Sequence, residues 1–336
     1  MENISERSRK QLSVCLLLLL AATLAINMLS GYIRHSEAGL GCADWPGCYG
    51  LVGTLALQMG ETAAVVALTP SETAKRYHRA IATGLVILVI VVVAQTRKLR
   101  FSGFAQYLPY LLIGVILLLA IVGPASYLKT RPAIATVNLL GGMALLAVSW
   151  ALWLAIQPTT GVNQHVSGGR VSSTLATLAL AVCVVQVVLG TWVSANFAGT
   201  ACTALWTCGD YENTRGASSA LWYLRELSVD AGGSIVIEQA QVFMHKAHRI
   251  GAVIATAVLC WFGVQATRSG GILSSWGKYL LGLLTAQIAL GLAALESGLP
   301  IILVLSHNLV ASLLLLCLLR LWLLTRPNVQ EVEPHG

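Results

Sequence analysis

The chain has 336 residues, of which 56% are hydrophobic and 10% are charged. Soluble domains carry roughly 25% charged residues, so the composition excludes an ordinary water-soluble domain and indicates a protein solvated by lipid. The formal charge of +7 comes from 21 Lys and Arg against 14 Asp and Glu. Several of the basic residues are next to histidines, where a role at a binding site accounts for them. The net charge therefore gives no reason to expect a nucleic-acid partner.

Eight apolar stretches are long enough to cross the ~30 Å hydrocarbon core of a bilayer as helices of about 20 residues each. They predict transmembrane helices near residues 12–32, 76–96, 105–123, 133–156, 172–195, 242–266, 277–296 and 301–325. The first stretch is too long for a removable signal peptide and no small-residue cleavage site follows it, so we expect an anchor. The predicted fold class is an all-α integral membrane protein with eight transmembrane helices.

Two tight basic clusters predict the orientation in the membrane. Three basic residues within 7–10 precede the first stretch, and three more within 97–100 lie in the short connection between the second and third. Cytoplasmic loops carry an excess of Lys and Arg, so we expect the N-terminus and both clusters on the cytoplasmic side. The long connections near 33–75 and 196–241 then lie on the outer side, as in a multi-pass protein of a bacterial inner membrane.

A cysteine pair with the spacing C-x5-C follows the first apolar stretch and returns, 160 positions later, after the fifth: Cys42 and Cys48, then Cys202 and Cys208. Both pairs lie in predicted outer loops, where an oxidising compartment favours a disulfide between cysteines six residues apart. A zinc site is the alternative, but no further cysteine or suitable histidine completes either pair to four ligands. We therefore predict the disulfides Cys42–Cys48 and Cys202–Cys208.

A His-Arg step is repeated as well, at the head of the second stretch and, 170 positions later, at the head of the sixth: His78-Arg79 and His248-Arg249. With the cysteine pairs, this indicates a duplicated four-helix unit. We expect an N-terminal half, an inner linker, a C-terminal half and a polar tail, over residues 1–156, 157–171, 172–326 and 327–336. Both halves start on the inner side, which predicts two parallel-repeat four-helix bundles related by an axis along the membrane normal.

A glutamine four residues before a glycine occurs in the fifth and seventh stretches, as Gln186 with Gly190 and Gln287 with Gly291. Small residues let helices approach closely, and an amide inside the membrane needs an internal hydrogen-bond partner. The corresponding positions of the first half hold Asn27 with Gly31 and Leu119 with Gly123. We interpret the pattern as close packing with one interhelical hydrogen bond rather than as a direct ligand contact.

Three of the seven histidines lie at membrane depth near the outer face: His78, His248 and His307. An ionisable residue there is a candidate functional residue. His248 and His307 lie on two helices of one half that run in the same direction, so their imidazoles are placed to ligate a heme iron in the bundle core. Arg79 and Arg249 are placed to neutralise heme propionates. The alternative is that each histidine bonds a neighbouring helix; the repeat favours heme.

The first half departs from this pattern. The position that corresponds to His307 is Asn138, six residues past Pro132, although a shift of one residue pairs Asn138 with Asn308. Asparagine is not a useful ligand for heme iron, so His78 would be the one histidine of its half at the site. An open iron position is compatible with a catalytic or substrate-holding site, and also with loss of function.

The run from Gly31 to Cys48, GYIRHSEAGLGCADWPGC, resembles the pattern G-x-V-R-x-T-x-S-G-L-G-C-x-D-W-P-x-C of the heme A synthase family of integral membrane proteins. The resemblance extends over all eight stretches. It implies an oxidoreductase that converts the C8 methyl of heme O to a formyl group and supplies heme A for cytochrome oxidase assembly. It also implies a permanent heme b between His248 and His307, and a catalytic site for the substrate heme at His78.

The chain differs from the family at two positions of the first half. The family motif Glu-x-x-His-Arg has Lys75 in place of its glutamate, and Asn138 stands where a second histidine is expected. A carboxylate near a cationic intermediate accepts protons or stabilises charge, whereas a lysine opposes that charge. Two other acids could take the place of this glutamate. Glu72 is six residues before His78 and about 120° away around the helix, and Glu37 lies in the loop that precedes it.

Two other functions stay open. A non-catalytic relative that binds heme b, as an assembly factor or heme carrier, would keep the fold without oxidising heme O. A transmembrane electron-transfer cytochrome needs heme ligands near both faces, whereas the candidates here lie near the outer face. For the enzyme, the expected partners are heme O, a heme O synthase, membrane lipid and an electron donor that the sequence does not identify. An oligomer is compatible with the sequence.

Overall fold

The computed structural model describes residues 2–36, 70–99, 101, 103–127, 130–157, 171–202, 204–205, 207–209, 216–230 and 235–326. Within them, eight helices are long and apolar enough to cross a membrane, which confirms the predicted all-α membrane fold. They are α1 (Glu2–His35), α3 (Pro70–Thr96), α4 (Leu108–Val122), α5 (Pro132–Ala155), α6 (Ser173–Ala195), α7 (Gln239–Arg268), α8 (Gly271–Glu296) and α9 (Ile301–Leu324). The span that contains α4 runs over Gly103–Ala125, because it includes the short turns on either side of the helix.

Helix ends follow local chemistry. Proline lacks a backbone N–H and is tolerated in a first turn, and α5 begins at Pro132 while Pro300 immediately precedes α9. The helix α4 is flanked by two short 3₁₀ turns, η2 (Gly103–Tyr107) and η3 (Gly123–Tyr127). The largest departure from the predicted spans is α1, which extends about three turns further toward the N-terminus. There, Glu6 and Lys10 form an ion pair one helical turn apart.

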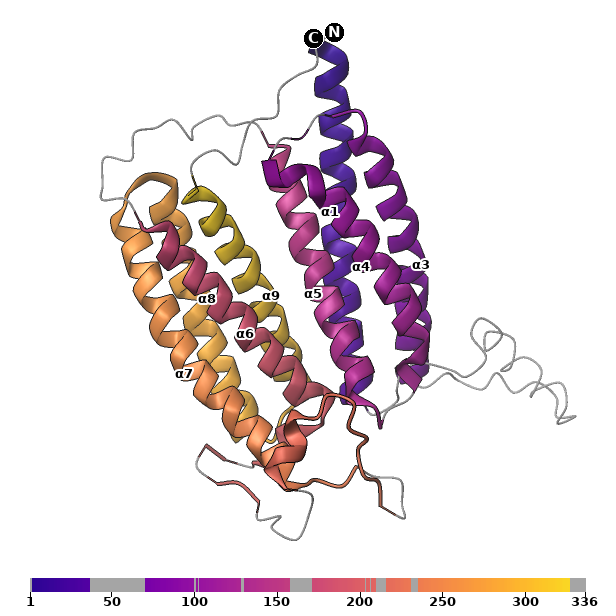
Figure 1. Ribbon diagram of the computed structural model, residues 1–336, viewed down its shortest axis with the longest axis vertical. Coiled ribbons are helices and arrows are strands. Elements are labelled where there is room, and N and C mark those ends of the chain that lie inside the picture. The colour runs from indigo at the N-terminus through magenta and orange to yellow at the C-terminus, as the bar shows by residue number, and fades with distance from the viewer. Residues whose placement is uncertain are drawn as a thin grey trace, which may run out of the picture.

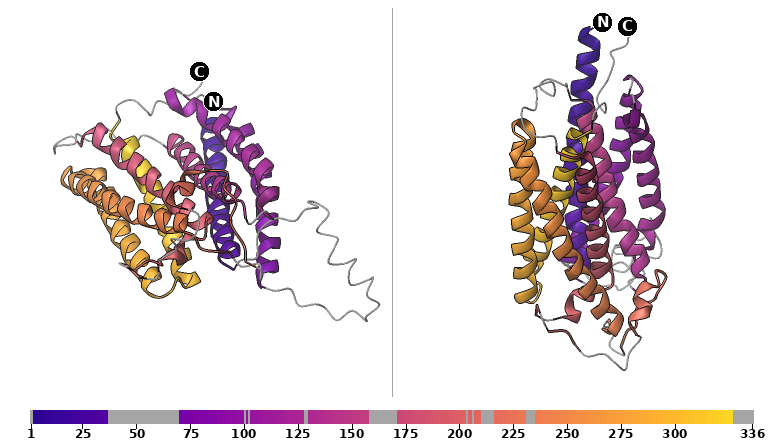
Figure 2. Two further views of the ribbon diagram at one scale, coloured as in Figure 1. Left: turned by 60° about the horizontal axis from the view of Figure 1, so that its bottom comes forward. Right: turned by 60° about the vertical axis from the view of Figure 1, so that its left-hand side comes forward.

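The helices pack as two neighbouring sets of four (Figures 1 and 2). In the first set α1 packs against α3, α3 against α4, α4 against α5, and α5 against α1, which closes a ring. The second set closes in the same order, through α6, α7, α8 and α9. Contacts of α5 with α6, α1 with α9 and α5 with α9 join the two rings. Descent of both rings from one duplicated unit remains a prediction.

Each ring has its tightly packed core in the half where α1 begins and α9 ends. In the first ring this core includes Leu16, Val89 and Leu152, and in the second it includes Phe262 and Leu318, all essentially inaccessible to solvent. Hydrophobic association does not drive helix packing within lipid, so close van der Waals contact of this kind is what holds such rings together. The other half of each ring contains the candidate histidines: His78 in the first ring, and His248 and His307 in the second.

The long connection between α6 and α7 reaches across to the first ring. It contains the 3₁₀ turns η4 (Ala198–Ala201) and η5 (Ala217–Leu221). Past η5, the backbone N–H of Leu227 donates to the carbonyl of Thr130 at 2.7 Å, and the hydroxyl of Tyr223 donates to the carbonyl of Ala133 at 3.3 Å. These bonds connect the loop to the start of α5, so the two rings are linked at this end as well.

Candidate functional site

The three histidines singled out from the sequence lie near the same end of the molecule. His78 is in the third turn of α3, His248 in the third turn of α7 and His307 in the second turn of α9, and these helices all begin at the end opposite to the start of α1 (Figure 1). In the second ring, α7 and α9 stand at opposite corners, because each of them packs against both α6 and α8. His248 and His307 therefore come from diagonal helices of one ring.

His248 is held by the neighbouring helix α6. The amide nitrogen of Gln186 lies 3.0 Å from Nδ1 of His248 and also donates to the main-chain carbonyl of His248 at 3.1 Å. One turn further along α6, Gly190 leaves room for the ring, since a β-carbon there would stand 3.2 Å from Cε1 of His248. The glutamine and the glycine of the Q-x3-G pattern thus contact the same imidazole.

His307 is held in the same manner by α8. The amide nitrogen of Gln287 lies 3.0 Å from Nε2 of His307, and a β-carbon at Gly291 would stand 3.1 Å from its Cε1. The other ring nitrogen of His307, Nδ1, is buried and has no hydrogen-bond partner within the described part of the chain. The predicted interhelical hydrogen bond of each Q-x3-G pattern is therefore present, and its partner is a candidate iron ligand in both cases.

The surroundings of these histidines are loosely packed. Every residue of 184–194, 246–254, 285–293 and 301–311 is at least partly exposed, including His248 and His307. These four segments form one layer across the second ring, directly beyond its tight core. In a well-packed bundle, interior side chains are fully buried at near-crystalline density. None of the residues in these four segments is buried, so this layer is packed less tightly than the core next to it.

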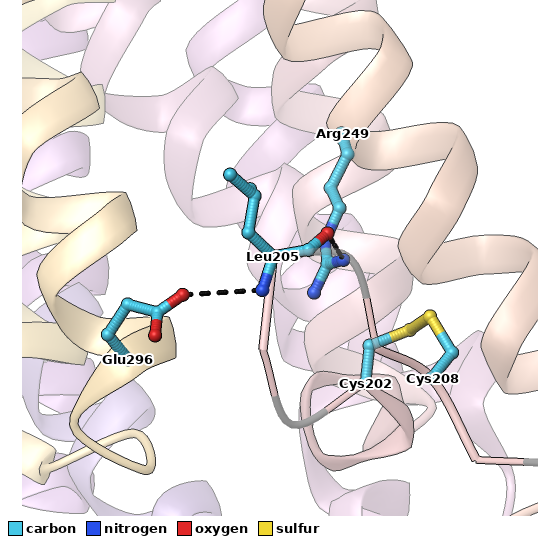
Figure 3. Close-up of a disulfide and its surroundings, with 5 residues drawn as sticks. All are labelled: Cys202, Leu205, Cys208, Arg249 and Glu296. Carbon is cyan, nitrogen blue, oxygen red and sulfur yellow. Dashed lines mark hydrogen bonds between the residues drawn. A yellow bond between two sulfur atoms is a disulfide. The ribbon is translucent and has the colours of Figure 1, made fainter.

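A small disulfide loop lies over this end of the second ring (Figure 3). Cys202 and Cys208 form a disulfide, as predicted. Between them, the carbonyl of Leu205 accepts a 2.6 Å hydrogen bond from Arg249, and the amide of Leu205 donates to Glu296 at 3.3 Å. The loop therefore links the start of α7 to the end of α8. Two further donors of Arg249, Nε and Nη2, are buried without a partner in the described residues.

The corresponding region of the first ring is built from different residues. Nε2 of His78 lies 3.3 Å from the hydroxyl of Ser30 on α1, so this histidine also contacts a neighbouring helix. The side chain of Asn27 turns instead toward the backbone of Gly142 on α5. Arg79 follows His78 directly and is partly buried, as is Asn138 on α5. Since α3 and α5 are diagonal in their ring, His78 and Asn138 take the places that His248 and His307 take in the other.

Some sequence predictions fall outside the described residues. Cys42 and Cys48, with their predicted disulfide, lie there, and so does Glu37. On α9, Asn308 faces Gly31 of α1 and so points toward the other ring, whereas its neighbour His307 points at α8. Sequence reasoning missed that both glutamines would meet the candidate histidines. The shared Q-x3-G spacing was the available signal, but it does not reveal which neighbouring helix the amide reaches.

Comparisons with known proteins agree with this architecture. A family model described as cytochrome oxidase assembly protein, COX15-CtaA, matches residues 13–319 of the chain. A heme A synthase from Shewanella oneidensis strain MR-1 is 32% identical over 317 residues, which cover 92% of this chain and 94% of that protein. The family predicted from the run 31–48 is thereby confirmed. The chain belongs to the COX15-CtaA family of cytochrome oxidase assembly proteins.

Proposed function

We propose that this chain is an oxidoreductase of the heme A synthase type, which oxidises the C8 methyl of heme O to a formyl group for cytochrome oxidase assembly. The observation that carries the proposal is the pair of diagonal histidines, His248 and His307, each held by a Q-x3-G pattern in a loosely packed layer. Membership in the COX15-CtaA family and similarity to a curated heme A synthase over nearly the whole chain support the same reaction.

The second ring is the proposed site of a resident heme b. Imidazole nitrogen is an axial ligand of heme iron, and helix bundles hold such ligands on facing helices. In each of the two histidines a glutamine engages one ring nitrogen, and in His307 the other nitrogen is buried without a partner. These features fit a bis-histidine heme. When bound, heme b would supply one-electron transfer to the reaction.

Arg249 is the proposed partner of a heme propionate. Its guanidinium stands one residue beyond His248 and has two buried donors, Nε and Nη2, without partners in the described chain. Hydrogen bonds between a guanidinium and a carboxylate are short and strong, and a second one can form in parallel. The bond from Arg249 to the Leu205 carbonyl fixes the third donor, so the side chain is already oriented before a propionate arrives.

The first ring is the proposed site of heme O oxidation. His78 would face the substrate heme, Ser30 would hold the imidazole, and Arg79 would meet a propionate, as Arg249 does in the other ring. Two substitutions weaken this part of the proposal: Lys75 stands where the family has glutamate, and Asn138 where it has histidine. They favour a second candidate function, a membrane protein of the same fold that binds heme b without oxidising heme O.

The cellular setting belongs to the proposal as well. We place the protein in a bacterial inner membrane with its N-terminus in the cytoplasm and the cysteine loops outside, on the basic clusters flanking the first three spans. A heme O synthase that delivers the substrate is the expected partner, together with an electron donor. Lipid contacts are expected over the outward faces of the eight spans.

The test is to express this chain together with a heme O synthase in a host that makes no heme A, then extract the hemes and separate them by chromatography with mass detection. The enzyme yields heme A or its hydroxylated precursor, and His78→Ala abolishes both. Unchanged heme O, with protoheme copurifying on the chain, rejects the enzyme and selects the non-catalytic heme-binding function.

A further inference from the structure

We infer that Gln186 with Gly190, and Gln287 with Gly291, are positioning residues that fix the orientation and the basicity of the two heme-ligating histidines. The inference rests on the proposed function, because it takes His248 and His307 to be the axial ligands of heme b. It extends that proposal to four residues that bind no iron themselves and tune the heme through the imidazole that each pair contacts.

Each candidate histidine ligand is contacted by a glutamine and a glycine from one neighbouring helix, and we call each such pair a glutamine–glycine site. Residues four apart on a helix lie one above the other on the same face. On α6 the amide of Gln186 bonds the imidazole at 3.0 Å and Gly190 lies against the same ring. On α8 the amide of Gln287 bonds the imidazole of His307 at 3.0 Å, at Nε2 rather than at Nδ1, and Gly291 lies against that imidazole. Each imidazole is therefore held by a hydrogen bond at one point and by a bare stretch of helix at another.

The second step is the chemistry of the amide. The ring nitrogen that binds a metal is selected by the hydrogen bond that the other nitrogen makes, and such a partner raises the basicity of the ligand. Each glutamine also has a buried amide oxygen, Oε1, without a partner in the described residues. A half-turn of the amide would bring this oxygen toward the imidazole, where it could accept the N–H of a ligated histidine. At Gln186 the same turn gives up the bond to the main-chain carbonyl of His248. The same amide can thus donate a hydrogen bond to the free histidine and accept one from the ligated histidine.

The third step is the contrast with the first ring. The position that corresponds to Gln287 is Leu119, and this side chain packs against Gly141 of α5 instead of forming a hydrogen bond with an imidazole. This ring has Asn138 where the second has His307. The position of Gln186 is taken by Asn27, which lies against Gly142, so Ser30 is the residue that meets His78. Within the described residues, a glutamine and a glycine together contact the candidate histidine ligands in the second helix ring and not His78 in the first.

The experiment replaces each glutamine in the full-length protein with leucine, which removes the hydrogen bond, and with glutamate, which is nearly isosteric and strengthens it. The heme midpoint potential is measured by spectroscopic titration. We expect Q186L and Q287L to raise the potential, because the histidine becomes less basic, and to weaken heme retention about 10–100-fold. Q186E and Q287E lower the potential. Shifts of opposite sign are not expected from a residue that only fills space.

The glycines are tested by electron paramagnetic resonance, which reports the relative orientation of the two imidazole planes. Gly291→Ala places a β-carbon 3.1 Å from the ring and should shift the low-spin g values, whereas Gly282→Ala on the same helix meets nothing within 4 Å and should not. Gln95→Leu is the matched amide control. Its Nε2 lies 3.5 Å from the sulfur of Cys15 in the first ring, and its loss should leave the potential unchanged.

The outcomes separate this inference from the proposed function. If the wild-type chain carries a low-spin heme that His248→Ala and His307→Ala abolish, while both leucine and both glutamate variants keep the wild-type potential, the positioning role is wrong and the heme site stands. If the wild-type chain has no low-spin heme, or keeps it in both histidine variants, the heme site itself is wrong and the inference fails with it.

Discussion

Among individual residues, Arg225 and Glu238 form a buried ion pair in the connection between α6 and α7. Their side chains are 2% and 5% exposed, and one guanidinium nitrogen lies 2.8 Å from a carboxylate oxygen. The hydroxyl of Ser228 donates to the other carboxylate oxygen at 2.9 Å. Glu238 also caps the start of α7 in a reciprocal arrangement with Gln241. This single pair therefore fixes where α7 begins, ten residues before His248.

We predict that Glu238→Gln lowers the free energy of unfolding by about 3–5 kcal/mol, because a buried guanidinium loses its counter-charge. The control is Glu226→Gln. Its carboxylate lies 4.0 Å from Arg131 on the surface, with both side chains more than half exposed, so the loss should be at most about 1 kcal/mol. Unfolding in detergent followed by tryptophan fluorescence measures both. Equal losses in the two variants would contradict the assignment.

Among the helices, the contact of α7 with α8 depends on glycine at two places. Gly270 and Gly271 join the two helices with φ angles of +75° and +54°, a region that other residues adopt at a cost. Further along α8, Gly277 packs directly on the last turn of α7. A β-carbon there would be 2.7 Å from the backbone nitrogen of Thr267. The hairpin at this end thus has no space for a side chain at position 277.

Gly277→Ala should therefore destabilise the protein by about 1–3 kcal/mol, the usual cost of overpacking a close contact. Gly282→Ala, five residues later on the same helix, meets nothing within 4 Å and should be neutral or slightly stabilising, since alanine is the better helix former. Thermal unfolding midpoints in one detergent compare the two variants. A loss at Gly282 as large as that at Gly277 would show that backbone flexibility, not packing, decides the result.

The disulfide loop supports a second prediction about elements. Closing the short loop between Cys202 and Cys208 restricts the unfolded chain, which is worth about 2 kcal/mol at this loop length. The bonds of Leu205 to Arg249 and Glu296 depend on that closure. Cys202→Ser should lower stability by this amount. In a background with Cys42→Ser and Cys48→Ser, which removes the other predicted disulfide, a reductant should do the same to the chain that keeps Cys202 and Cys208 but not to the one with Cys202→Ser/Cys208→Ser. Reductant sensitivity retained in the double variant would assign the effect to another bond.

Across the whole molecule, the sequence was sufficient to predict those features that depend on a short stretch of the chain. Apolar runs of about 20 residues identify membrane spans because lipid demands internal backbone hydrogen bonds, and all eight appeared near their predicted positions. The extra turns of α1 were missed because charged residues such as Arg7 end an apolar run without ending a helix. The Cys202–Cys208 disulfide was also predictable, because two cysteines six residues apart in a loop are a local signal.

Which side chains of different helices contact one another could not be predicted from the sequence in the same way. The sequence marked His248, His307 and both Q-x3-G patterns as separate features, and neither spacing nor composition says that Gln186 reaches His248. That contact depends on which helices are neighbours and on how each is rotated about its axis, which distant residues decide together. Conversely, the hydrogen bonds that the sequence offered as an alternative to heme ligation are present, and they engage one nitrogen of each ring.

The central claim is that the two rings have separate roles, with a resident heme between His248 and His307 and a substrate heme at His78. The most direct measurement is the heme content and the reduced-minus-oxidised spectrum of the purified wild type and of His78→Ala, His248→Ala and His307→Ala. The account predicts a single low-spin heme per chain in the wild type and in His78→Ala, and its loss in the other two. Retention of that heme in His248→Ala and His307→Ala, or its loss in His78→Ala alone, would contradict the account.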